Sequence, residues 1–171
     1  MILKKNKTGF TIIEILLYVG ISSIVLSSIA VFTAGMLQAR VKSQTMAEVE
    51  QQGLETMQMI TQTVRNAHQI NSPNVGNESS SLSIDVESVD KSPTVFDSSA
   101  GKVRIKEGSG SYIALTNSRV SVSDLKFRNL SRGQTPGIIE LSFHVEYINS
   151  SGRNEYDFGQ DFKSSVTLRR D

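Results

Sequence analysis

The feature that most constrains this chain is a long apolar stretch near its start. Residues 10–37 contain one charged residue, Glu14. A helix of these 28 residues would be about 40 Å long. That length is enough to cross a hydrocarbon core of ~30 Å with some tilt. The stretch therefore predicts a transmembrane helix.

Cations flank the apolar stretch and predict its orientation. Lys4, Lys5 and Lys7 precede it, and Arg40 and Lys42 follow it. Because cytoplasmic flanks carry the excess of Lys and Arg, this distribution favours a cytoplasmic N-terminus. An ordinary secretory signal peptide is not expected, since its apolar region is about half as long and ends in a small-residue cleavage site. A plain membrane anchor would leave Glu14 without a role.

Composition limits the chemistry available to the chain. Cysteine is absent and aromatic residues make up only 6%, which excludes disulfides and cysteine-based chemistry. The formal net charge of +1 becomes −2 without the three lysines that precede Gly9. Since nucleic-acid binding normally depends on a basic surface, and no cluster of basic and aromatic residues stands out, nucleic acid is not expected as a direct partner.

The segment Gly9-Phe10-Thr11-Ile12-Ile13-Glu14 follows a short lysine-rich leader and opens the apolar stretch. It resembles the processing site of type IV prepilins and the related pseudopilins. The resemblance implies that prepilin peptidase, a membrane-embedded aspartyl peptidase, cuts between Gly9 and Phe10 and then N-methylates Phe10. It also implies that Glu14 contacts the Phe10 amine of a neighbouring subunit in a filament.

Physical arguments agree with that assignment for Glu14. A carboxylate within a spanning segment costs about 2–3 kcal/mol or more, so it needs a partner. In the first turn of the mature helix the dipole favours an anion. Pairing with an ammonium in a dry bundle removes two desolvation penalties and penalises a wrong register. The alternative is that Glu14 complements only its own helix terminus or its own amine.

Other segments resemble the same family and indicate a subclass. Residues 63–67 look like the end of this helix in minor pilins, and residues 161–170 look like the closing strand of minor pilins and J-type pseudopilins. The chain lacks the helix-bending proline and the C-terminal disulfide loop of many major pilins. The resemblance therefore favours a minor pilin or pseudopilin, a structural subunit that joins or primes a pilus or pseudopilus.

Beyond residue 37 the composition turns polar while the helical period continues to about Ile70. Apolar or small residues recur at steps of three or four: Met46, Val49, Gly53, Met57, Ile60, Val64 and Ala67. This stripe predicts an amphipathic helix over 38–70 that packs on a downstream domain. A two-chain coiled coil is the alternative, although Gly53 interrupts the seam. Gly53 would permit a close backbone contact or a bend.

Residues 71–171 predict a domain with an antiparallel β-sheet. Residues 71–81 are expected to form a loop, and apolar residues then alternate with polar ones. Strands are expected around 82–86, 103–105, 113–115, 120–127, 139–147 and 162–168, with turns at 98–101, 108–110, 133–137 and 149–152. The fold class is therefore α+β and pilin-like. Its parts are a cleaved leader (1–9), a transmembrane or filament-core helix half (10–37), an amphipathic helix half (38–70) and a sheet domain (71–171).

No catalytic or cofactor-binding pattern emerges from the sequence. The two histidines, His68 and His144, are isolated and are interpreted as surface or helix-terminal residues, so no Ser-His-Asp set is expected. Asp85, Glu87 and Asp90 could contribute to a Ca²⁺ site, but the EF-hand spacing is absent and a solvated strand face is favoured. We therefore expect a protein that is not an enzyme and has no metal or other cofactor.

Two functions remain open. The first is a minor pilin or pseudopilin in the cytoplasmic membrane that later joins a surface filament. Its partners would be other pilin subunits, prepilin peptidase and, before assembly, the membrane. The alternative is a membrane-anchored module, exported by the same route, that binds DNA or a surface ligand through cations such as Arg128, Arg132 and Arg153.

Overall fold

The structure, a computed structural model of the chain, describes residues 9–133 and 136–169. The leader residues Lys4, Lys5 and Lys7, part of the turn expected at 133–137, and Arg170 lie outside the described residues. The chain divides into two compact units, with the boundary between Arg40 and Val41. This boundary falls three residues after the change in composition at residue 37.

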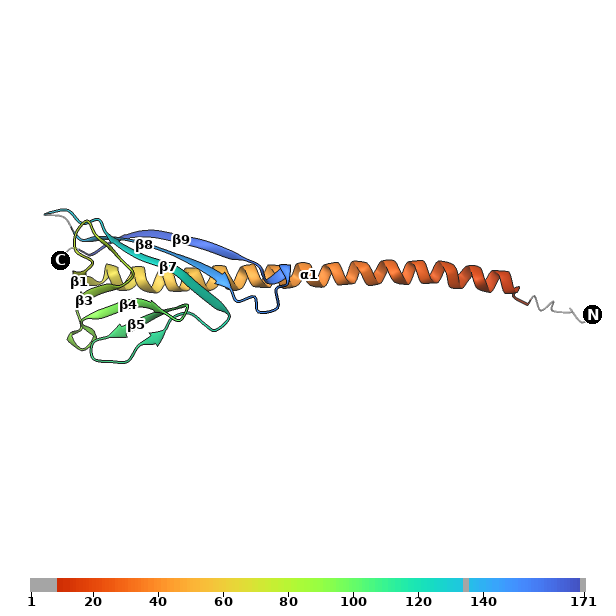
Figure 1. The fold of residues 1–171 in the computed structure, drawn as a ribbon, viewed down its shortest axis with the longest axis horizontal. Helices are drawn as coiled ribbons and strands as arrows, with labels where there is room; N and C mark the ends of the chain where they lie inside the picture. Colours follow the sequence, from red (N-terminus) through yellow and green to blue (C-terminus); the bar gives the residue numbers. More distant parts are fainter. Residues whose placement is uncertain (1–8, 134–135, 170–171) are drawn as a thin grey trace, which may run out of the picture. The chain divides into compact units, whose positions relative to one another are not determined.

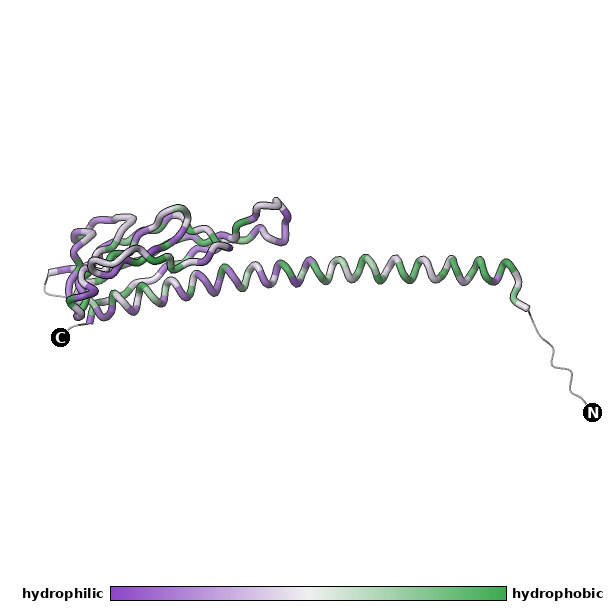
Figure 2. Tube along the Cα trace, turned by 90° about the horizontal axis from the view of Figure 1, so that it is seen from below, coloured by the Kyte–Doolittle hydropathy of each residue, from purple (hydrophilic) through white to green (hydrophobic). Residues whose placement is uncertain are grey.

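One helix, α1 (Ile12–Arg65), runs through both units (Figure 1). Thr11 caps its start, because the Oγ1 atom of Thr11 accepts a hydrogen bond from the backbone N–H of Glu14 at 3.3 Å. This Thr-x-x-Glu arrangement is typical of helix N-termini. Figure 2 shows that the first half of α1 is apolar along its length, whereas polar residues are frequent in the second half.

The helix ends earlier than the sequence predicts. It stops at Arg65, and Ala67–Ser72 form strand β1 instead of a continuation of the helix to Ile70. The apolar period continues through this segment, but the backbone of β1 pairs with β3, as in the pairs Ala67↔Val86 and Ile70↔Ile84. Tertiary pairing therefore overrides the local helical pattern.

The sheet domain contains two antiparallel sheets instead of the single sheet expected. One has the strand order β1-β3-β4-β5-β6 and the other β2-β7-β8-β9. The remaining strands are β2 (Glu78–Ser79), β3 (Leu82–Val86), β4 (Thr94–Ser99), β5 (Lys102–Glu107), β6 (Ile113–Ala114), β7 (Val120–Asn129), β8 (Ile138–Tyr147) and β9 (Gly159–Thr167). Two short 3₁₀ helices cover Val89–Lys91 and Asn154–Tyr156.

The strand predictions are confirmed for β3, β5, β6, β7, β8 and β9, within a few residues at each end. Three strands were not predicted. β1 covers the end of the expected helix, 67–70, and the first two residues of the expected loop 71–81, and β2 lies within that loop. β4 lies where no strand is expected, and its last two residues, 98–99, fall in the turn expected at 98–101. β2 and β4 lack a long alternating pattern, so pairing with neighbouring strands determines them.

The second half of α1 packs on the strands and completes one hydrophobic core. Its buried residues are Thr45, Val49, Gly53, Thr56, Ile60 and Val64. Met46 was expected on this face but is 40% exposed, and Met57 is only partly buried. Threonines at the preceding positions, 45 and 56, occupy the face instead. The stripe is thus covered by the chain's own strands, as in the favoured interpretation, giving an α+β fold consistent with a pilin-like layout.

Candidate functional site

The predicted processing bond lies just before α1. Gly9 and Phe10 are exposed, and neither belongs to the helix. A Cβ atom added at Gly9 would have no neighbour within 4 Å, and the Phe10 side chain is 72% exposed. Exposed backbone outside regular secondary structure is the usual site of proteolytic cleavage. The Gly9–Phe10 bond is therefore exposed and lies outside the helix.

Glu14 is the one residue between Gly9 and Arg40 that is partly buried instead of exposed. The hydroxyl of Tyr18 donates a hydrogen bond to Oε1 of Glu14 at 3.3 Å. The ring of Phe10 meets the ring of Tyr18 edge-on, with 6.3 Å between centroids. Glu14 and Tyr18 lie one turn apart on the same face of α1, and Phe10, just before the helix, contacts the Tyr18 ring. Tyr18 is not among the site residues predicted from the sequence, although its spacing of four residues from Glu14 places the two side chains on neighbouring turns of a helix.

The apolar half of α1 is long and apolar enough to span a membrane. Its most apolar window has a mean hydropathy of 2.3, and none of that window is buried in the structure. The segment is therefore not a core helix of the sheet domain. Hydroxyl groups within it bond to backbone carbonyls one turn earlier, as Ser27 does to Ser23 at 2.8 Å and Thr33 to Ile29 at 2.8 Å. Such bonds satisfy polar groups in a medium without water.

The sheet domain contains a cluster of basic and aromatic side chains, contrary to the sequence-based expectation. Arg104 on β5 forms a bidentate ion pair with Asp97 on β4, at 2.9 Å and 2.8 Å. The Arg104 guanidinium lies 4.3 Å from the ring centroid of Tyr112, and Nζ of Lys106 lies 5.7 Å from it. The hydrogen bond to Asp97 raises the pKa of Arg104 above its ordinary value. The sequence does not predict this cluster, because Tyr112 follows β5 in the chain and only a turn brings its ring back over that strand.

His144 and Asp85, considered above for catalysis and for Ca²⁺ binding, both contact neighbouring side chains. Nδ1 of His144 lies 2.6 Å from Oδ1 of Asp161, but the Nε2 side of the ring lies against Gly159. Oδ1 of Asp85 accepts hydrogen bonds from Asn71 and Ser92. Within residues 9–133 and 136–169, no group of three or more acidic or histidine side chains could hold a metal ion.

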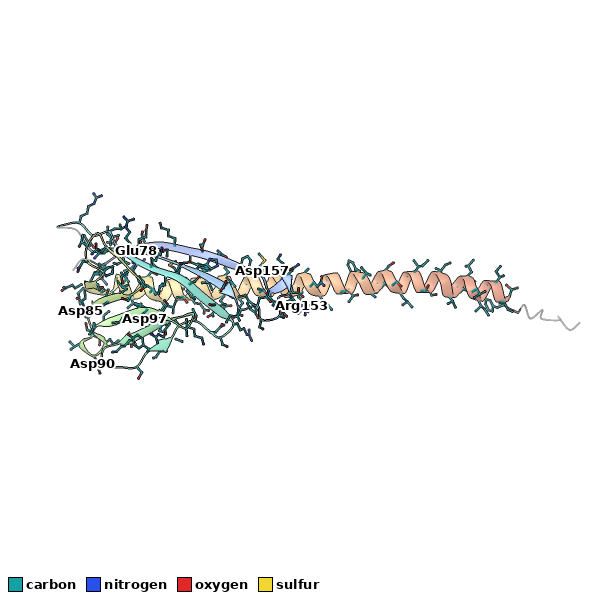
Figure 3. The ribbon with its side chains drawn as sticks, viewed as in Figure 1. Glu78, Asp85, Asp90, Asp97, Arg153 and Asp157 are labelled. Atoms are coloured by element: carbon teal, nitrogen blue, oxygen red, sulfur yellow. The ribbon has the colours of Figure 1, made fainter. Side chains whose placement is uncertain are left out.

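The cations considered for the binding alternative differ in their surroundings. Arg153 forms an ion pair with Glu155 and lies 5.8 Å from the ring centroid of Tyr156. Arg128 lies opposite Glu78 on β2 and Glu140 on β8 in the sheet register. Figure 3 shows Arg153 and Glu78 in different parts of the sheet domain. Arg128 and Arg153 therefore lie apart and each has an acidic neighbour.

Comparison with known proteins gives no match: no protein-family model, no curated protein and no solved structure corresponds to this chain at a significant level.

Proposed function

We propose that this protein is a minor type IV pilin or pseudopilin, a structural subunit that prepilin peptidase cuts after Gly9. The observation that carries the proposal is the exposed apolar surface of α1 before Arg40, with Glu14 in its first turn. An apolar helix half, exposed along its length, carries a single carboxylate in its first turn and follows an exposed Gly-Phe bond. A membrane anchor needs the apolar surface, but it needs neither Glu14 nor that bond.

Cleavage changes what Glu14 can bind. Before cleavage the nitrogen of Phe10 is a neutral peptide amide, and the carboxylate accepts its hydrogen bond from Tyr18. After cleavage the same nitrogen is an amine that carries positive charge near neutral pH. Within a dry helix bundle, a neighbour's ammonium is a stronger partner for the carboxylate than a hydroxyl. Processing thereby creates the group that selects the register between subunits.

The uncharged surface that follows Glu14 supports the same role. The hydroxyls of Ser23, Ser27, Ser28 and Thr33 donate to backbone carbonyls of the helix itself, so these four donors need no partner from a neighbouring subunit. Small residues such as Gly20 and Gly35 allow neighbouring helices to approach closely. We expect the apolar half to be held first by lipid and then by the helices of other subunits, while the sheet domain faces the aqueous side.

The proposal is tested by replacing the carboxylate without changing its shape. Glu14→Gln should still be cut after Gly9, because the bond remains exposed. Its content in sheared surface filaments should fall at least tenfold relative to the processed protein in the membrane, measured by quantitative immunoblotting. Tyr18→Phe is the matched control, since it removes the in-chain donor but keeps the ring, and it should assemble. Normal assembly of Glu14→Gln would refute the role of Glu14.

The alternative function, an anchored binding module, makes a different prediction for the same variant. A module that works only from the membrane would keep its binding activity and its surface exposure when Glu14 is replaced. Loss of filament content together with retained membrane insertion therefore separates the two functions.

A further inference from the structure

A row of cations lies on the outer face of β5. Lys102, Arg104 and Lys106 occupy alternate positions, while Val103 and Ile105 between them point into the core. Alternate residues of a strand project from the same face at intervals of about 6.6 Å. The three cations therefore form an evenly spaced row on the outside of the five-stranded sheet.

Tyr112 adds an aromatic surface to this row. Its ring packs on the guanidinium of Arg104 and lies near Nζ of Lys106. The Tyr112 side chain remains 43% exposed, so part of the ring is open to solvent. Contact with two cations holds the ring in place, which lowers the entropic cost of stacking a ligand on it.

The charge of the row is unevenly compensated. Asp97 neutralises Arg104 through two hydrogen bonds, and Figure 3 shows Asp97 on this part of the sheet. Within the described part of the chain, neither Lys102 nor Lys106 forms an ion pair. Two free lysines therefore flank an arginine whose main role is to position the ring.

We propose that this face, Lys102, Arg104, Lys106 and Tyr112, binds single-stranded nucleic acid. The ligand must carry regularly repeated negative charge to match the lysines. It must also present flat aromatic groups to stack on Tyr112, and single strands combine both properties. A duplex hides the faces of its bases within the stack, and an acidic polysaccharide has no aromatic face. The near-neutral net charge of the chain does not exclude this site, because net charge averages over surfaces that a ligand never touches.

The test measures binding of a fluorescent oligothymidylate of about 12 nucleotides to the full chain in neutral detergent micelles. Fluorescence anisotropy is recorded over a range of salt concentrations. Two free lysines predict a slope of about −1.4 for the logarithm of the binding constant against the logarithm of salt concentration. Lys102→Ala/Lys106→Ala should weaken binding at least tenfold and bring the slope close to zero. The matched control is Lys126→Ala/Lys163→Ala, which removes two ion-paired lysines of the other sheet and should leave binding unchanged.

Two further variants separate stacking from charge. Tyr112→Ala should weaken binding at least fivefold with the salt slope unchanged, and Tyr112→Phe should restore it. Asp97→Asn frees the charge of Arg104, so it should tighten binding and steepen the slope to about −2.1. Thermal unfolding of each variant checks that the sheet domain remains folded. The tighter binding expected for Asp97→Asn cannot result from misfolding.

The proposal is overturned if the double lysine variant binds the oligonucleotide as tightly as the unmodified chain. It is also overturned if heparin binds more tightly than the oligonucleotide and Tyr112→Ala has no effect, because that result assigns the face to acidic polysaccharides. The test involves neither Gly9 nor Glu14, so its outcome is independent of the proposed role in filaments.

Discussion

The ring of Phe162 on β9 occupies the space that a side chain at position 53 of α1 would fill. A Cβ atom built on Gly53 would lie 2.1 Å from Cζ and 2.2 Å from Cε2 of Phe162. Phe162 in turn stacks on Phe143, with 5.5 Å between ring centroids. Gly53 therefore allows α1 to approach the four-stranded sheet closely, which is one of the two roles that the sequence suggests for it.

Gly53→Ala should destabilise the sheet domain by up to about 2 kcal/mol. The added methyl group forces the ring of Phe162 to move, at a cost of about 1–3 kcal/mol, and the better helix propensity of Ala returns about 1 kcal/mol. Pulse proteolysis in urea, on the full chain in detergent micelles, measures the free energy of unfolding. In a Phe162→Leu background the penalty should shrink because the smaller side chain yields. An equal penalty in both backgrounds would show that the contact is not its cause.

Thr56→Val should stabilise the domain by about 1 kcal/mol. The Thr56 side chain is 1% exposed, and its hydroxyl has no hydrogen-bond partner. A buried donor left without a partner is unfavourable, and valine has nearly the same shape. Thr45 is the matched control, since it is 2% exposed but its Oγ1 donates to the carbonyl of Val41 at 3.1 Å. Thr45→Val should bring no gain, and equal effects at both sites would contradict this explanation.

A substitution at Ala100, the first central residue of the turn between β4 and β5, should stabilise the sheet domain. Ala100 has φ of 51° and Gly101 has φ of 70°, so both central residues are left-handed. Turns of this kind favour Asn-Gly, because Asn tolerates positive φ better than Ala. Ala100→Asn should raise the unfolding free energy by about 0.5–1 kcal/mol.

Gly101→Ala tests the same turn with a substitution that should destabilise it. It should be destabilising by about 1 kcal/mol or more, because its Cβ would lie 2.7 Å from Oγ of Ser121 in addition to the positive φ. If both changes at this turn proved neutral in pulse proteolysis, the assigned turn geometry would be wrong.

Asn117 ties the loop before β7 to α1. Its Nδ2 donates to Oε1 of Glu48 at 2.5 Å, and its backbone N–H donates to Oε1 of Gln52 at 3.0 Å. Asn117→Ala should cost about 1–2 kcal/mol, since it leaves the partly buried Glu48 with only the longer bond to Arg119. Arg119→Ala removes that exposed bond alone and should cost less than 1 kcal/mol. A larger loss for Arg119→Ala would reverse the assigned roles.

Much of the fold could be predicted from periodicity, because long amphipathic elements state their own buried faces. The alternation of β8 is of this kind, and the apolar half of α1 could be predicted from its length and its lack of charges. The end of α1 could not be predicted, since Ala67 and Ile70 continue the helical stripe and only their pairing with β3 makes them a strand. The choice of Thr45 and Thr56 over Met46 and Met57 also depends on tertiary packing, because the two sets lie one position apart.

The candidate sites differ in the same way. The Gly9–Phe10 bond and Glu14 are contiguous in sequence, so a local pattern identifies them. The partner of Glu14, Tyr18, could be identified from its helical spacing, but an uncharged tyrosine in an apolar stretch does not by itself indicate a partner for a carboxylate. The face formed by Lys102, Arg104, Lys106 and Tyr112 could not be predicted, because the turn after β5 brings Tyr112 back over residues six and eight positions earlier.

The most direct test of the central claim is mass spectrometry of the N-terminus of this protein in sheared surface filaments. Terminal peptides are compared between cells with and without prepilin peptidase. The proposed function predicts a peptide that begins at Phe10 with one added methyl group on its nitrogen, and no such peptide without the peptidase. Assembled protein that still carries residues 1–9 would contradict it.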